Sequence, residues 1–352
     1  MDAHARPQRS PLGALREFGI VRLLGWVVVG VLLLWLFVNF TKGPSEFINI
    51  FVIGVSNGAV YGLIALGYTL VYGILQLINF AHGDVFALGG LMASTVILSL
   101  FKLDEQSGAG IVILGVACAL LIAIVFSSAL NTTVELVGYR RLRNAPRLAP
   151  LITAVGMSFI LLDVGLIGWG VDYSSTPRLI PNSNAFQIGG VNFQWNKIAI
   201  LLIAVPVLVA LTWLVTKTRQ GKAMRATSQD QEAAAMMGVN VNRTISFTFA
   251  LAGGLAGAGG LLYVLNFTTI RYDQGFQLGL IAFTAAVLGG IGNMSGAVLG
   301  ATVIGLIEAF NEGLTWHAPG SDWTRSMIFG VLIAILVFRP EGLLGERTPE
   351  GG

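Results

Sequence analysis

The chain has 352 residues, of which 55% are hydrophobic and 11% are charged, with a net charge of +3 at neutral pH. Soluble domains carry about 25% charged residues, so this composition excludes an ordinary soluble protein. The small positive charge is gathered between apolar stretches, which favours basic cytoplasmic loops over a nucleic-acid-binding surface.

Ten apolar stretches are long enough, or nearly so, to cross a hydrocarbon core of about 30 Å. Their continuous Ala-, Gly- and Leu-rich character predicts helices rather than strands, and hence an all-α polytopic membrane protein. The predicted spans are 20–40, 47–68, 84–101, 109–130, 149–170, 198–216, 244–267, 278–291, 296–312 and 323–338.

The predicted organisation is a cytoplasmic extension (1–19), one transmembrane domain (20–340) and a cytoplasmic tail (341–352). The first apolar run has full span length and no small-residue cleavage site follows it, so we expect a retained helix rather than a signal peptide. The polar segment 171–197 is expected to form an external cap or a short helix.

Lysine and arginine placement predicts the orientation of the spans, because cytoplasmic loops are enriched in these residues. Even numbers of predicted crossings separate the basic groups, so both termini are expected in the cytoplasm. The groups are Arg6, Arg9, Arg16 and Arg22; Arg140, Arg141, Arg143 and Arg147; Lys217, Arg219, Lys222, Arg225 and Arg243; and Arg339 with Arg347.

Two segments interrupt the helical pattern: LINFAHGDVFALGG (77–90) and VLGGIGNMSGAVLG (287–300). Irregular backbone at membrane depth is tolerated where it is buried in protein or lines a wet cavity, and glycine also permits close helix packing. Leu-Gly-Gly occurs in both segments, at 88–90 and 288–290, in halves that run in opposite directions. This pattern predicts broken helices and an inverted repeat.

The basic loop 217–243 contains a helix-forming stretch from Lys222 to Met237, followed by Gly238 as a C-cap. A solvated connector helix is one interpretation. The segment Glu232-Ala233-Ala234-x-x-x-Gly238 also resembles the EAA loop of ABC-transporter permeases, although no Ile-x-Leu-Pro follows the glycine. That resemblance implies contact with an ATPase, through Arg225, Asp230, Glu232, Ala233, Ala234 and Gly238.

Four collinear blocks extend the resemblance over about residues 45–340. NGAVYGLIALGYTLVYGILQLINFAHGDVF (57–86), YRRLRNAPRLAPLITAVGMSFIL (139–161), RATSQDQEAAAMMGVN (225–240) and AFTAAVLGGIGNMSGAVLG (282–300) are similar to the permease subunits of high-affinity branched-chain amino-acid ABC importers. The resemblance implies a permease domain in a bacterial-type inner membrane, with a second homologous permease, cytoplasmic ABC ATPases and an external solute-binding protein as partners. Surrounding lipid is the remaining expected partner.

This chain is expected to be a transport subunit rather than an enzyme. It lacks the nucleotide-binding pattern GxxxxGK[ST], so ATP and Mg are expected on the partner ATPase and no cofactor on this chain. Its three histidines, His4, His82 and His317, are too scattered for a metal site, and we nominate no catalytic residue. Alternatives are a permease for urea, short amides or other amino acids, an ion-coupled carrier, or a channel.

Three polar residues of the first break, Asn79, His82 and Asp84, have competing interpretations. They could satisfy freed backbone groups at the cytoplasmic mouth between the second and third spans. They could instead line the translocation path, because intramembrane ionisable groups usually face protein or water. A proton relay through His82 and Asp84 is the third interpretation, since histidine titrates near neutral pH.

Further candidates for the path are Asn57 and Tyr61, which lie one helical turn apart on the second span. The second break adds Gly289, Gly290 and Asn293. Two other intramembrane acids, Asp163 and Glu308, are expected to pair with a neighbouring helix or to face a subunit interface.

Overall fold

The computed structural model describes residues 11–142, 145–146, 148–339 and 341–345. Its α-helices are α1 (Pro11–Lys42), α2 (Pro44–Leu75), α3 (His82–Thr95), α4 (Ala109–Val134), α5 (Leu148–Trp169), α6 (Trp195–Lys217), α7 (Arg219–Gln229), α8 (Gln231–Met236), α9 (Val241–Phe267), α10 (Gln274–Gly289), α11 (Met294–Gly313) and α12 (Ser321–Phe338). The shorter elements are η1 (Val96–Leu100), η2 (Glu135–Tyr139), η3 (Arg140–Leu142), β1 (Ser174–Ser175), β2 (Asn184–Ile188), β3 (Val191–Gln194) and β4 (Thr269–Ile270).

Nine helices within the described ranges are long and apolar enough to cross a membrane, and the 16-residue α10 is a shorter apolar helix. The prediction of an all-α membrane protein with about ten spans is therefore confirmed. Helix α1 begins at Pro11, so the described residues before 20 belong to this helix rather than to a separate extension. Outside the described residues lie the rest of the extension (1–10, with Arg6 and Arg9), the loop residues Arg143 and Arg147, and the tail 346–352 with Arg347.

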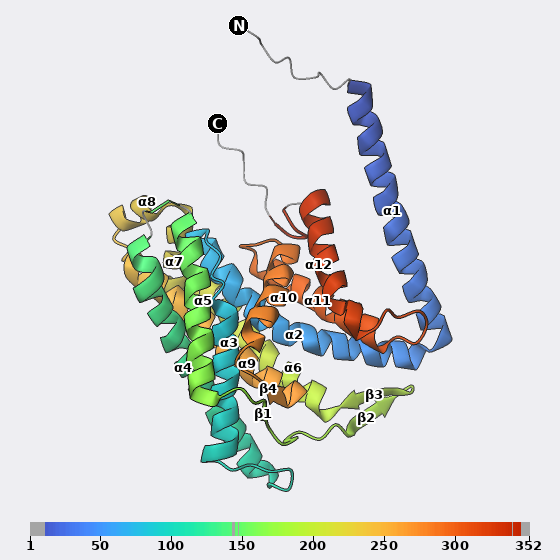
Figure 1. Ribbon diagram of the computed structural model, residues 1–352, viewed down its shortest axis with the longest axis horizontal. Helices are drawn as coiled ribbons and strands as arrows, with labels where there is room; N and C mark the ends of the chain where they lie inside the picture. The colour runs from blue at the N-terminus through green and yellow to red at the C-terminus, as the bar shows by residue number, and fades with distance from the viewer. Residues whose placement is uncertain (1–10, 143–144, 147, 340, 346–352) are drawn as a thin grey trace.

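Helices α2, α3 and α9 are the most buried spans, and α2 and α9 cross the centre of the molecule, whereas few residues of α4, α5, α6 and α12 are buried (Figure 1). Helix α2 packs against α10 and α11, and α9 packs against α3 and α4. Each central helix thus packs mainly on the helices of the opposite half. The inverted repeat itself stays a prediction.

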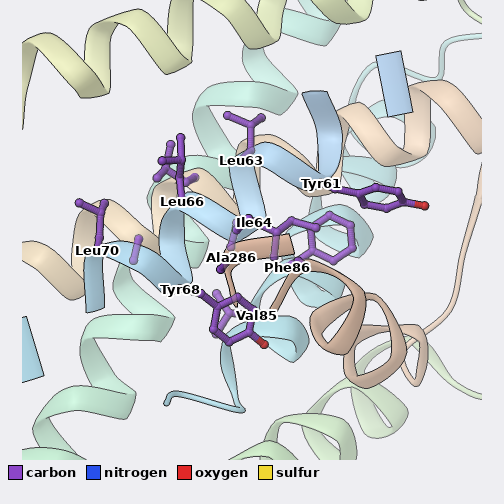
Figure 2. Packing of buried hydrophobic residues seen from close by; sticks show 14 of the residues in the cluster. Tyr61, Leu63, Ile64, Leu66, Tyr68, Leu70, Val85, Phe86 and Ala286 are labelled. Carbon is purple, nitrogen blue, oxygen red and sulfur yellow. The ribbon is translucent and has the colours of Figure 1, made fainter. Parts of the chain in front are cut away.

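Glycine allows the helices to pack this closely. A Cβ atom added at Gly253 would lie 2.3 Å from the carbonyl oxygen of Ser127, and one added at Gly257 would lie 2.3 Å from that of Ala123. The crossing of α4 and α9 therefore depends on glycine. In membrane bundles, small residues let the helix backbones approach this closely. Nearby, Leu63 and Ile64 of α2 and Phe86 of α3 fill the core beside Gly259 of α9 (Figure 2).

The two breaks are shorter than predicted. Helix α3 begins at His82, so residues 82–90 are helical and the irregular backbone is confined to 76–81. The second break comprises residues 290–293, where Gly290 and Gly292 have φ values of 105° and 97°. Glycine adopts these values without the steric cost that a side chain would add.

Of the two forms expected for the polar segment 171–197, the short helix is wrong and the external cap stays a prediction. Strands β2 and β3 form an antiparallel hairpin there, with Phe186 opposite Phe193. Their rings stack with centroids 4.7 Å apart, which gives this exposed hairpin an apolar contact of its own. The hairpin and α8 lie at opposite ends of the molecule (Figure 1).

Candidate functional site

The loop between α6 and α9 contains two short helices, α7 and α8, rather than the single helix predicted from Lys222 to Met237. The helix is interrupted at Asp230, whose backbone is extended (φ −155°, ψ 114°). Its carboxylate accepts hydrogen bonds from the backbone N–H groups of Glu232 and Ala233, at 2.8 and 2.9 Å. Aspartate favours this N-cap geometry over a helix interior, which accounts for the interruption.

Helix α8 ends at the glycine that the sequence predicts as its C-cap. Gly238 has a φ of 84°. Its N–H donates to the carbonyl of Ala235, and the N–H of Val239 donates to that of Ala234, both at 3.0 Å. This pair of bonds forms a Schellman motif, so the C-cap prediction is confirmed. Side-chain and backbone caps therefore hold both ends of a six-residue helix.

The exposed surface of α8 and of its C-cap residue, Met237, combines one acid and two methionines. Ala234 is buried, whereas Glu232 is exposed and the side chains of Met236 and Met237 are 83% and 85% exposed. Sequence reasoning did not single out the methionines, although two adjacent apolar residues in a polar loop were a usable signal. Flexible methionines are common on protein-binding surfaces.

Arg225, predicted to contact an ATPase, reaches the chain's own backbone. Its guanidinium donates to the carbonyl of Val215 and, at 3.4 Å, to that of Thr216. These carbonyls belong to the last turn of α6, where a cation also complements the helix dipole. Arg225 therefore fastens α7 to the end of α6.

Asn79 takes part in a buried hydrogen-bond network that joins the first break to α4 and η2. Its amide donates to Asn131 Oδ1 at 3.2 Å and its oxygen accepts from the Tyr139 hydroxyl at 3.1 Å. The Asn131 amide then donates to the carbonyl of Phe249 on α9 at 2.7 Å. Sequence reasoning missed Asn131, although an asparagine within an apolar span is itself a signal of an interhelical contact.

We expect Asn131→Leu to destabilise the fold by about 1–3 kcal/mol, because it leaves the carbonyl of Phe249 and the amide of Asn79 buried without this partner. The measurement is thermal unfolding of the purified chain in mild detergent. Thr133→Val is the matched control, since the exposed Thr133 hydroxyl donates only to the carbonyl of Ala129 in its own helix. Equal melting temperatures for the two variants would contradict the structural role of the network.

His82 and Asp84 make different direct contacts, although both lie near Tyr68 of α2. The His82 ring is fully buried and packs edge-on against Tyr68 of α2, with centroids 4.8 Å apart. The Asp84 carboxylate accepts a hydrogen bond from the Ser158 hydroxyl of α5. These contacts, with those of Asn79, tie the start of α3 to α2, α4 and α5.

The glycines and the asparagine of the second break hold the segment 341–345. The N–H of Leu343 donates to the carbonyl of Leu288 at 2.8 Å, and that of Leu344 donates to the carbonyl of Gly289 at 2.9 Å. Asn293 donates from its side chain to the carbonyl of Leu344, also at 2.8 Å. A Cβ atom on Gly290 would meet the backbone of this segment, so the close contact requires glycine there.

Asn57 and Tyr61 lie together on α2, as their spacing predicts, and both are buried. Asn57 accepts a hydrogen bond from Asn266 of α9 at 3.0 Å. Glu308 of α11 lies beside both residues, which fulfils the expectation that this acid meets a neighbouring helix. Asp163, by contrast, is exposed on α5.

Within the described part of the chain, no group of acidic, histidine or cysteine side chains has the arrangement of a metal site.

Residues 50–337 match a family of proteins described as the permease component of a branched-chain amino acid transport system. The chain belongs to this permease family. Its resemblance to such permeases is thereby confirmed, as is the expectation that it is a transport subunit rather than an enzyme.

Individual relatives agree with this assignment. The permease is 36% identical over 300 residues to the high-affinity branched-chain amino acid transport system permease protein BraD of Pseudomonas aeruginosa, over 84% of this chain and 95% of BraD. It is 34% identical over 303 residues to LivH of Escherichia coli K12, with the same coverage of both chains. The fructose import permease protein FrcC of Rhizobium meliloti is 28% identical over 200 residues, or 54% of each chain.

Proposed function

We propose that the permease forms part of the translocation path of an ATP-driven importer for branched-chain amino acids in a bacterial-type inner membrane. The similarity to BraD and LivH over nearly their full lengths supports this substrate class over urea, amides or sugars. The path is proposed to include Asn57, Tyr61 and the residues of the two breaks. Selectivity is assigned mainly to an external solute-binding protein that delivers the amino acid.

The observation that carries the ATP-driven mechanism is the exposed and doubly capped helix α8. Only Ala234 is buried in its six residues, so Glu232, Met236 and Met237 remain available to a partner. An acid and two flexible apolar side chains suit a groove on a cytoplasmic ATPase, where close contact with methionine gains apolar burial. ATP and Mg would bind to that separate chain.

Asp163 supports a second permease subunit as a partner. It is exposed within the apolar helix α5, among exposed large side chains such as Phe159 and Ile167. A carboxylate facing lipid costs at least about 2.5 kcal/mol near the middle of a membrane. A second permease packed on this face of α5 would remove that cost by covering Asp163 with protein.

The proposed orientation places α7, α8 and both termini in the cytoplasm. Successive spans cross the membrane in alternating directions. Their order therefore places the α6–α9 loop, the end of α12 with Arg339 and the start of α5 on the same side of the membrane. The basic residues of these segments then lie in the cytoplasm, in agreement with the positive-inside rule. The β2–β3 hairpin lies on the external side.

Affinity purification of the tagged chain from its native host in mild detergent, followed by mass spectrometry, tests this assignment. We expect a second permease and ATPases to be recovered, and leucine uptake by vesicles holding the complex to require ATP. Repeated recovery of the chain without an ATPase would contradict the proposal. So would uptake that follows the proton gradient while ATP remains high, which is the behaviour of an ion-coupled carrier.

A further inference from the structure

A second polar cluster lies at the end of the helices opposite α7 and α8, where α6 begins and where α9 and α11 end. Four helices contribute to it: Asn57 and Tyr61 from α2, Lys197 from α6, Asn266 from α9 and Glu308 from α11. We call these five residues the head-group cluster. Tyr61 points its hydroxyl away from the other labelled side chains of the apolar core (Figure 2), and this hydroxyl donates to the Glu308 carboxylate.

Two amides separate the positive and the negative charge of the cluster. Lys197 Nζ donates to Asn266 Oδ1 at 2.6 Å, and Asn266 Nδ2 donates to Asn57 Oδ1 at 3.0 Å. Glu308 lies at the other end of this chain of contacts, beside Asn57 and Tyr61. The ammonium group therefore contacts an amide oxygen, although the Glu308 carboxylate of opposite charge lies near enough to interact with it electrostatically.

The carboxylate of Glu308 retains unused bonding capacity. Its Oε2 atom is buried and has no hydrogen-bond partner among the described residues. Burying part of an ionised group without a partner is costly, and a direct ion pair with Lys197 would reduce that cost. Ionisable residues kept in a membrane at such a cost usually serve ligand or ion pathways.

We propose that the head-group cluster binds the zwitterionic α-ammonium and α-carboxylate groups of an amino acid as it enters the path. The Glu308 carboxylate accepts hydrogen bonds from the ligand ammonium, and Lys197 donates to the ligand carboxylate. Tyr61 donates a hydrogen bond from its hydroxyl to the Glu308 carboxylate, and the hydroxyl of Tyr263 lies close enough to interact with the same acid. This site rests on the proposed function, because it assumes an amino acid as substrate.

The first test measures leucine uptake by the intact importer in proteoliposomes, with its binding protein, for Glu308→Gln and Lys197→Gln. Both variants keep hydrogen-bonding groups but lose one charge, and each is expected to lower uptake at least tenfold with normal recovery of the complex. Glu312→Gln is the matched control: Glu312 is exposed one turn from Glu308, and it accepts a hydrogen bond from Thr324 at 3.0 Å. Wild-type uptake by both cluster variants would overturn the site.

The second test separates ligand binding from a role in holding the helices together. It measures thermal unfolding of the nucleotide-free complex, without binding protein, because a ligand that binds only the folded state raises the melting temperature. Leucine at about 10 mM is expected to raise the melting temperature. Two analogues should not raise it: leucinamide, which lacks the carboxylate, and 4-methyl-2-oxopentanoate, which lacks the ammonium group. Glu308→Gln should remove the leucine effect, and Glu312→Gln should retain it.

The two proposals fail in different ways. If the wild-type complex takes up leucine with ATP but leucine does not change its melting temperature, the head-group cluster is not the binding site and the proposed function stands. The same conclusion follows if both analogues stabilise the complex as well as leucine does. If the wild-type complex takes up no leucine with ATP, the proposed function fails, and the site with it.

Discussion

The double variant Glu232→Lys, Gly238→Trp is expected to lose nearly all ATP-driven uptake while the chain still reaches the membrane. Gly238 has a φ of 84°, and this left-handed conformation is less favourable by about 1–2 kcal/mol for a residue with a Cβ atom. Tryptophan therefore disturbs the Schellman motif that ends α8, and lysine reverses the charge offered by Glu232. A Cβ atom at Gly238 would meet nothing within 4 Å, so the damage stays local to α8.

Uptake of labelled leucine by whole cells, normalised to the amount of chain in the membrane fraction, measures this effect. Gln229→Lys is the matched control, because it adds a cation at an exposed position of α7 just outside α8. Its uptake should match that of the wild type. If the double variant also transports normally, α8 does not couple ATP hydrolysis to transport.

Gly257→Val is expected to lower the stability of this chain more than Asn131→Leu does. A Cβ atom at Gly257 would lie 2.3 Å from the carbonyl oxygen and 2.7 Å from the carbonyl carbon of Ala123, both backbone atoms of α4. Because backbone cannot rotate aside, α4 and α9 must separate. Overpacking in a filled core costs about 1–3 kcal/mol and occasionally more, and we expect at least the upper value.

Membrane yield and the melting temperature in detergent both report this loss. Gly330→Val in α12 is the matched control, since a Cβ atom there would meet nothing within 4 Å. We expect the control to unfold within a few degrees of the wild type. A Gly257→Val chain as stable as the control would show that the α4–α9 crossing tolerates a wider separation than this geometry implies.

The spans could be predicted from sequence because the length of an apolar run is a local property that the membrane thickness sets. The ends of irregular segments could not. Residues 82–90 contain three glycines and two polar residues, yet they are helical because α3 is packed against α9 and α10, whose close approach those glycines permit. Asp230 shows the opposite case, in which one capping residue overrides a strongly helix-forming stretch.

The candidate site was predictable in composition but not in its contacts. Asn57 and Tyr61 share a face because helical spacing is local. The partners of Asn79 and Asp84, which are Asn131 and Ser158, lie 52 and 74 residues away in sequence, so only tertiary packing reveals them. Likewise, no local pattern connects Lys197 with Asn266, since the relation between α6 and α9 decides that contact.

The attachment of Arg225 to the end of α6 gives this helix a mechanical role. Its 23 residues span about 35 Å, with the Arg225 contacts at one end and Lys197 at the other. If a partner displaces α7 and α8, the Arg225 contacts join that displacement to α6, whose other end carries Lys197. Pro206 lies inside α6, and its ring removes one backbone hydrogen bond from the helix. A displacement at the α7–α8 end would thus reach the head-group cluster through its lysine.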